Sequence, residues 1–219
     1  MQTVKHAKLN TGGGLGNPSK MPGTSYGLSA EVCKLGAILA RQAGTTCHGC
    51  YAMGGNYQYS SVKVAHARRL ASLSNPGWVE SMAFLIARAA KRSGVRYHRW
   101  HDSGDLQSLA HLQQIVAVAR LTPSVRYWLP TRELATVKAW ERVTPARLRP
   151  RNLVIRVSAT RVDGTLPPRP ATVSGVSALA DSETYPTAVH CPAPTQGNAC
   201  ESCRRCWRRD VKAVVYHKH

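Results

Sequence analysis

Four cysteines crowded into one short stretch near the C-terminus constrain this chain more than any other feature. They are Cys191, Cys200, Cys203 and Cys206, and the last three have the spacing C-x2-C-x2-C. Two intervening residues let a loop place successive thiolates on different corners of one compact cluster, and iron–sulfur proteins use this spacing repeatedly. A structural zinc site more often takes two C-x2-C pairs from separate hairpins. We expect a [4Fe–4S] cluster here, with a four-cysteine zinc site and disulfides or free thiols as the alternatives.

A second group of cysteines lies in the N-terminal part of the chain. Cys33 is followed by Cys47 and Cys50, and residues 34–43 have the composition of a short helix between them. Three thiolates can hold a cubane by three of its irons and leave the fourth iron open, which is typical of a reactive cluster. The alternative is that at least one of the three is an inert buried thiol and that no separate site exists here.

The charge of the chain predicts a polyanionic partner. Lys and Arg total 30 against 11 acidic residues, which gives a formal net charge of +19. Such a balance favours attraction to nucleic acid, although a basic surface without a partner is the alternative. The arginines most suited to contact phosphates surround the last cysteines, at Arg204, Arg205, Arg208 and Arg209.

The sequence contains no segment that predicts a membrane or a secretory route. No apolar run approaches the roughly 20 residues that would span a bilayer, and the polar, Gly-rich N-terminus has no signal-peptide core. We therefore expect a cytoplasmic protein, in which thiols stay reduced and clustered cysteines act as metal ligands. Seven cysteines are also an odd number, which argues against a complete disulfide framework.

The hydrophobic pattern predicts an α/β fold. Strands alternate with amphipathic helices, which is typical of a parallel sheet, either a partial (β/α) barrel or an open sheet, with a cysteine-rich C-terminal loop region. We expect a single domain over 1–219, with a Gly-rich arm of loop and turn at 1–30, an α/β core at 31–178 and a cysteine-rich extension at 179–219. The expected helices span 75–93, 106–121 and 132–143, the last capped by Thr131. The expected strands span 95–100, 125–129, 153–157, 172–176 and 211–216.

Short polar runs follow three of these strands. They are residues 101–105, 131–133 and 158–161. The chemistry of parallel α/β proteins gathers beyond the carboxyl ends of the strands, so these runs should converge on one rim. We take Asp102, Ser103, Asp105 and Arg132 as candidate catalytic residues. The alternative is that these polar residues only cap the following helices.

Taken together, these blocks resemble the phage "gene product 88" family. The resemblance rests on Cys33, on Cys47-x-x-Cys50-Tyr-Ala, on His101-Asp-Ser-Gly-Asp105 and on Cys200-x-x-Cys203-x-x-Cys206-Trp207, which occur in the family's order over most of residues 20–207. It implies a phage or prophage origin and the cytoplasm of a host bacterium.

A more distant resemblance is to radical-SAM enzymes, which hold a three-cysteine cluster near the start of a partial (β/α) barrel. It implies binding of S-adenosylmethionine, with Ser103, Gly104 and Asp105 as the counterpart of the motif that holds its amino group, and Tyr51 and Ser158 as further contacts. The sequence departs from the usual C-x3-C-x2-C spacing between Cys33 and Cys47, and Tyr51 follows the last cysteine instead of preceding it. Under this resemblance the C-terminal cysteines would hold an auxiliary cluster.

Two functions follow from these patterns. The first is an iron–sulfur redox or radical-SAM-like enzyme with an open-site cluster, and such an enzyme could act on nucleic acid. The second is a nucleic-acid-binding protein whose metal site is structural or senses redox state.

Overall fold

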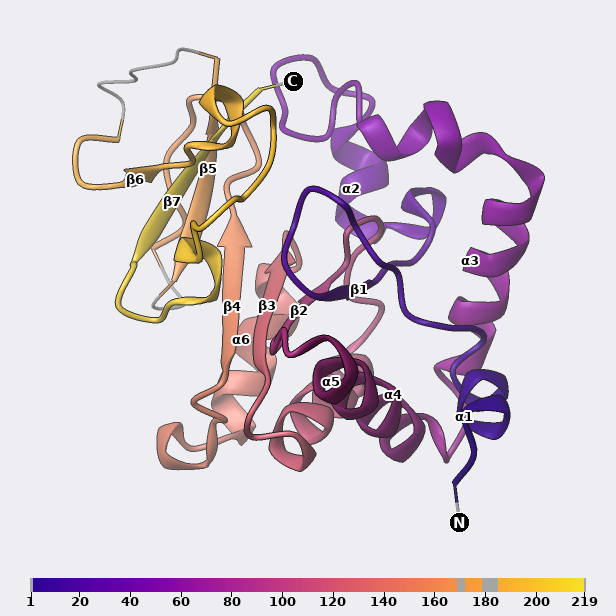
Figure 1. The fold of residues 1–219 in the computed structure, drawn as a ribbon. Helices are drawn as coiled ribbons and strands as arrows, with labels where there is room; N and C mark the ends of the chain where they lie inside the picture. Colours follow the sequence, from indigo (N-terminus) through magenta and orange to yellow (C-terminus); the bar gives the residue numbers. More distant parts are fainter. Residues whose placement is uncertain (1, 169–171, 179–184, 219) are drawn as a thin grey trace.

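An open, all-parallel sheet forms the centre of the molecule. The computed structural model describes residues 2–168, 172–178 and 185–218. Seven strands pair in the order β1-β2-β3-β4-β5-β7-β6, and every pairing is parallel (Figure 1). This confirms the predicted α/β class and selects the open sheet over the partial barrel. The strands are β1 Thr24–Tyr26, β2 Tyr97–Trp100, β3 Arg126–Thr131, β4 Leu153–Ser158, β5 Val173–Ser177, β6 Val189–His190 and β7 Ala213–His217.

The structure has six α-helices in its described residues. They are α1 Val4–Asn10, α2 Lys34–Leu39, α3 Ser60–Ser72, α4 Trp78–Ser93, α5 Leu109–Leu121 and α6 Leu134–Val143. Those expected at 75–93, 106–121 and 132–143 are present as α4, α5 and α6 with slightly different bounds, and α1 was not predicted. The prediction that Thr131 caps the third expected helix is wrong. Thr131 is the last residue of β3, and Glu133 occupies the N-cap position of α6. The turn between them is so tight that the Thr131 hydroxyl accepts the backbone N–H of Glu133.

The segment predicted as a Gly-rich arm of loop and turn contains regular structure, so that prediction is wrong. Thr3 caps α1 by accepting the backbone N–H of His6, and β1 forms the first edge of the sheet. Gly23 makes this edge possible: its φ is +76°, and a Cβ there would lie 1.9 Å from the carbonyl oxygen of Tyr97 on β2. Only glycine lets the chain approach β2 this closely.

Helices α4, α5 and α6 lie side by side and cover one face of the sheet (Figure 1). Alternate strand residues point into this core, because successive side chains of a strand face opposite sides. Its centre is aromatic: Trp78 of α4 lies with its ring centroid 5.9 Å from those of both Tyr26 and Trp100. Burial of these large side chains is the main stabilisation of the helix-covered face.

The opposite face of the sheet is covered by the cysteine-rich C-terminal loop. Trp128 of β3 packs there with Cys206, Trp207 and Val214. Arg156 of β4 reaches up from the sheet with 0% exposure, and its guanidinium donates hydrogen bonds to the carbonyls of Cys206, Arg205, Arg208, Val211 and Val173. A buried charge needs such partners, so Arg156 and this loop depend on each other.

The extension predicted at 179–219 begins within residues 179–184, which lie outside the described residues. Its later part adds β6 and β7 to the same sheet, and β7 is the strand predicted at 211–216. Within the described ranges, no helix is long and apolar enough to cross a membrane.

Candidate functional site

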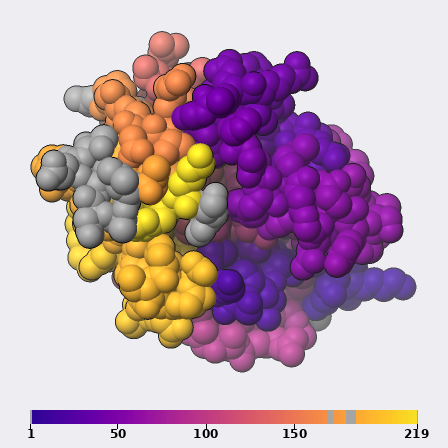
Figure 2. All heavy atoms as spheres, turned by 90° about the horizontal axis from the view of Figure 1, so that it is seen from above, coloured from indigo at the N-terminus to yellow at the C-terminus, as the bar shows by residue number. Residues whose placement is uncertain are grey.

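The carboxyl ends of all seven strands meet at one edge of the sheet, because every strand runs in the same direction. Viewed from above in Figure 2, the violet N-terminal segment that contains the first three cysteines lies on one side, and the orange and yellow C-terminal segment on the other. The polar runs that follow β2, β3 and β4 therefore arrive at this edge near the N-terminal cysteine group, whereas Cys206 of the C-terminal group packs over a face of the sheet. The geometry below describes which of the predicted residues actually meet.

Asp105 joins the run after β2 to the end of β3. It is 5% exposed. Its Oδ1 accepts the hydroxyl of Thr131 at 2.6 Å and the backbone N–H of Leu106 at 2.7 Å, and its Oδ2 accepts the backbone N–H of Arg132 at 2.8 Å. Burial raises the pKa of Asp105 to about 6, against these hydrogen bonds, which lower it. Both carboxylate oxygens are thus engaged by the protein, and Asp105 acts as a clamp between two strand ends.

Arg132 extends the same connection to β4 and to the N-terminal cysteine segment. Its Nε donates to Oγ1 of Thr46 at 2.9 Å, and that hydroxyl donates to the carbonyl of Ala159 at 3.0 Å. Ser158, predicted as a cofactor contact, lies 2.9 Å through its Oγ from Oγ of Ser174 on β5. The predicted rim is therefore one connected structure.

The three N-terminal cysteines come together beside this rim. A Cβ on Gly36 of α2 would lie 3.5 Å from Sγ of Cys33 and 3.7 Å from Sγ of Cys47, so both thiols face the same small space. Burial raises the pKa of Cys33 to about 12, and the charges of Asp105, Cys47 and Cys50 raise it further while Arg132 opposes them. Burial likewise raises the pKa of Cys47. Without a compensating cation these thiols stay protonated.

The thiols lie near one another but do not form a complete binding site for a single metal ion. Among the described residues, no group of three or more His, Cys, Asp or Glu side chains has an arrangement that could hold a metal ion. Four thiolates on one tetrahedral zinc, with Zn–S near 2.3 Å, stand only about 3.8 Å apart. Thiolates on a cubane bind separate irons and stand further apart.

The remaining predicted rim residues support the chain around β1 and β2. The Ser103 hydroxyl donates to the carbonyl of Leu28 at 2.7 Å, and the Tyr51 hydroxyl donates to the carbonyl of Asp102. Gly104 has a φ of +75°, and a Cβ there would lie 2.8 Å from Cβ of Leu28. These contacts give Ser103 and Gly104 a packing role that the sequence alone does not reveal. Asp102 differs, because its Oδ1 is buried without a hydrogen-bond partner among the described residues.

The four C-terminal cysteines also lie within electrostatic reach of one another. Burial raises the pKa of Cys206 to about 12, and the charges of Cys191 and Cys200 add to that rise. Burial and the charge of Cys203 raise the pKa of Cys191. The backbone N–H of Cys203 donates to the carbonyl of Cys200 at 2.7 Å, which forms the tight turn that the C-x2-C spacing predicts. All seven cysteines are free thiols in the structure.

Arg99 lies between the rim and the C-terminal cysteine group, and sequence reasoning missed it. This partly buried residue of β2 has its guanidinium 4.6 Å from the ring centroid of Trp128 and donates from Nη1 to Sδ of Met21 at 3.2 Å. Burial lowers the pKa of Arg99, but the charges of Tyr51, Asp102, Tyr216 and Cys206 outweigh it and the pKa is raised overall. A cation thus lies between the rim and Cys206. The sequence feature that could have identified Arg99 is its position as a charged residue within the strand sequence Tyr-His-Arg-Trp.

Three of the four arginines predicted to bind nucleic acid are already engaged. Arg204 lies 5.3 Å from the ring centroid of Tyr97, Arg205 donates to the carbonyl of His190, and Arg208 pairs with Asp210. Arg209 is exposed. Arg208 and Arg209 lie at the surface of the loop, whereas Arg204 contributes to its packing.

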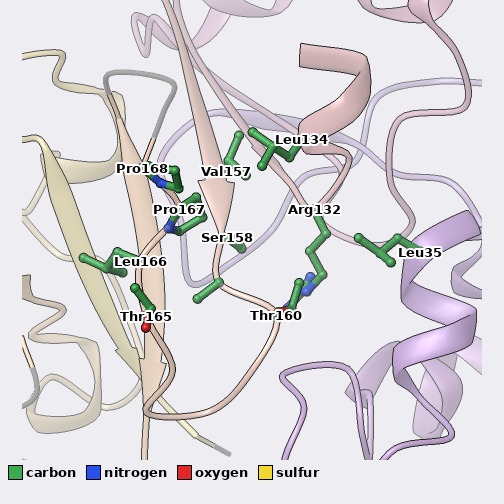
Figure 3. Close-up of a pocket in the computed structure, with 11 residues that line it drawn as sticks. Leu35, Arg132, Leu134, Val157, Ser158, Thr160, Thr165, Leu166, Pro167 and Pro168 are labelled. Atoms are coloured by element: carbon green, nitrogen blue, oxygen red, sulfur yellow. The ribbon is translucent and has the colours of Figure 1, made fainter. Parts of the chain in front are cut away.

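A hollow of about 330 Å³ opens beside the rim at the ends of β3 and β4 (Figure 3). Arg132 and Leu35 line one side of it, and the loop Thr165–Pro168 lines the other. Leu35 is two residues from Cys33, and its backbone N–H donates to the carboxylate of Glu133 at 3.0 Å. The hollow and the three-cysteine group therefore share the segment 33–35 and the side chain of Arg132.

Comparison with known proteins gives one match. No curated protein and no solved structure matches the chain. A family model described as gene product 88 matches residues 2–209, which is nearly the whole chain and includes every cysteine and rim residue described above. The chain therefore belongs to the gene product 88 family.

Proposed function

We propose that this protein is an iron–sulfur enzyme of the redox or radical type, with a reactive cluster at the carboxyl edge of its sheet. The observation that carries the proposal is the meeting of Cys33, Cys47 and Cys50 beside Asp105 and Arg132. These residues come from three separate segments of the chain, and they meet next to a hollow that can hold a small molecule. Cys191, Cys200, Cys203 and Cys206 would hold a second cluster.

The donor set supports a cluster at both places. All the expected ligands are thiols, which are the ligands that iron–sulfur clusters take. Three thiols leave one iron without a protein ligand, and such an open iron can bind a substrate or a cosubstrate, as the open position of a catalytic zinc does. The cluster would supply one-electron chemistry. The chain itself supplies a partly enclosed site, the positive charge of Arg132 beside the thiolates, and a rigid support through the Asp105 clamp.

S-adenosylmethionine is the cosubstrate that radical chemistry would require, and the Ser103–Asp105 turn was the segment expected to hold it. Both oxygens of Asp105 already accept hydrogen bonds from the protein. This favours the redox branch of the proposal, with Asp102 as the remaining rim carboxylate that has an unpaired oxygen. Addition of S-adenosylmethionine to the reduced protein, followed by EPR, distinguishes the two branches.

The first test of the proposal is the metal and sulfide content of protein purified without oxygen and with ample iron. We expect iron and acid-labile sulfide in nearly equal amounts and broad absorbance near about 400 nm. Zinc bound without sulfide would contradict the proposal. Replacement of the three N-terminal cysteines should remove only part of the iron, because the C-terminal group is separate.

A second candidate function is nucleic-acid binding with a structural or redox-sensing metal site. The net charge of +19 favours it. In the part of the chain that the structure describes, only three ion pairs form. Most of the 30 basic side chains are therefore not neutralised internally and can attract phosphates. The two functions are compatible, since the enzyme could act on a nucleic acid of phage or host.

A further inference from the structure

We infer that the hollow beside Arg132 is a binding pocket for a small molecule with a carboxylate head and an apolar body. Its volume of about 330 Å³ is near the lower end of the range that ligand pockets occupy. The inference names a substrate class for the proposed enzyme and in that sense rests on the proposed function. The binding itself requires only the folded chain.

The walls of the hollow are apolar. The end of β4 and the start of α6 form its floor, and a proline-containing loop closes the side opposite α2 (Figure 3). The apolar side chains that line it are Leu35, Leu134, Val157, Leu166, Pro167 and Pro168. A ligand that enters must exchange water for these surfaces, so the larger part of it is apolar.

Arg132 sets the charge of the ligand. Among the described residues that line the hollow, it is the single charged side chain. Its Nε is anchored on Thr46, which fixes the guanidinium at the edge of the hollow. No carboxylate among the described residues lies within ion-pair distance of it. Its Nη2 also donates to the carbonyl of Thr46 at 3.5 Å, so Nη1 and the second hydrogen of Nη2 remain for a ligand. An arginine that is held in place, partly buried and not ion-paired to a described carboxylate is suited to a planar carboxylate, which it can bind through those two groups.

The position of the hollow relates it to the cysteines. Arg132 also contributes to the electrostatic environment of Cys33 and Cys47, and Leu35 lies in the turn of α2 that follows Cys33. A carboxylate bound to Arg132 would therefore lie beside the three-cysteine group. The ligand's head, and not its apolar end, would face the reactive centre.

The test is calorimetric titration of the full-length protein with sodium octanoate and, in parallel, with octan-1-ol, at about 0.15 M salt, where long-range surface attraction is screened. We expect octanoate to bind at one site and more tightly than the alcohol. Arg132→Gln should weaken octanoate by about tenfold or more and leave the alcohol nearly unchanged. Lys138→Gln removes the same charge from the exposed face of α6 and should change neither.

Thr165→Trp provides a second, independent arm. Thr165 is an exposed lining residue, so the substitution should fill the mouth without disturbing the core, and it should weaken both ligands. Octanoate affinity that is equal to that of the alcohol, or that falls as much with Lys138→Gln as with Arg132→Gln, would overturn the inference. If octanoate fails these tests but the protein contains iron and sulfide, the proposed function stands and only the pocket inference fails. If octanoate binds as expected but the protein contains no cluster, the pocket inference stands and the proposed function fails.

Discussion

The guanidinium of Arg156 donates a hydrogen bond from Nε to the backbone carbonyl of Cys206 at 3.1 Å, on the face of the sheet that the cysteine-rich loop covers. The same guanidinium binds the carbonyls of Arg205, Arg208 and Val211, so one buried side chain organises the end of the cysteine loop. Cys206, the last cysteine of the chain, is thus positioned from β4, outside the loop itself.

Replacement of this arginine should loosen the cysteine loop. Arg156→Met would leave several buried carbonyls without donors, each costing about 1–3 kcal/mol, and we expect a loss of at least about 3 kcal/mol in the free energy of unfolding. Hydrogen exchange should show the largest increase at residues 204–211. Arg126→Gln, an exposed change on β3, is the matched control. Unchanged exchange in Arg156→Met would show that the loop does not depend on this residue.

Gly36 should be required for loading of the N-terminal cluster. A methyl group there would lie 2.9 Å from Cβ of Cys33 and would occupy the space that the two nearest thiols face. We expect Gly36→Ala to lower iron and sulfide content while far-UV circular dichroism stays the same. Gly54→Ala, whose new Cβ would find its nearest neighbour 4.0 Å away, should load normally. Equal loading of the two variants would place the cluster elsewhere.

The helix-covered core should make the protein sensitive to acid. Burial lowers the pKa of His98 from its ordinary 6.5 to about 3, and burial lowers that of His111 to about 4. The unfolded chain takes up these protons near pH 6.5 and the folded chain does not. Stability therefore falls as the pH drops from about 6.5 towards about 3, by up to about 1.4 kcal/mol per pH unit for each histidine.

Urea unfolding at a series of pH values checks this expectation. His98→Gln should reduce the slope of stability against pH between about 6.5 and 4, whatever its effect on stability at neutral pH. His6→Gln, an exposed change on α1, should leave the slope unchanged. A slope in His98→Gln equal to that of the natural chain would show that His98 is not the group that resists protonation.

Binding to nucleic acid should depend steeply on salt. Each phosphate neutralised on duplex DNA contributes a slope of about −0.9 in log K against log salt, and about −0.7 on single strands. Neutralising the exposed Arg209 should reduce this slope, whereas Arg204 and Arg205, which already contact the protein, and Arg208, which pairs with Asp210, should matter less. Absence of binding to duplex and single strand alike at about 50 mM salt would remove this partner class.

The sequence predicts the parts of this fold whose signal is periodic. The apolar stripe of α4, from Trp78 through Ile86, repeats at helical spacing, and short apolar runs that alternate along the chain with helical segments mark β3 and β4 as strands. Strand β1 escapes prediction because it has three residues between glycines, and its place in the sheet comes from pairing with β2, which is distant in sequence.

The sequence predicts which residues belong to the candidate site, but not what each of them contacts. The parallel order of the strands brings the polar runs to one edge, as expected. A sequence does not show that both carboxylate oxygens of Asp105 accept hydrogen bonds from Thr131, Leu106 and Arg132. Arg99 and Arg156 escape prediction for a related reason. An arginine within an apolar strand is ordinarily an exposed residue, and only the path of the C-terminal loop over this face buries these two.

The most direct test of the central claim is EPR of the reduced, iron-loaded protein with and without added cyanide, a small ligand that binds an open iron. We predict that cyanide changes one signal, that Cys47→Ala lacks this signal, and that a second, cyanide-insensitive signal from the C-terminal cluster persists in Cys47→Ala. A protein whose entire EPR signal ignores cyanide and is the same in Cys47→Ala would contradict the claim that Cys33, Cys47 and Cys50 hold an open-site cluster.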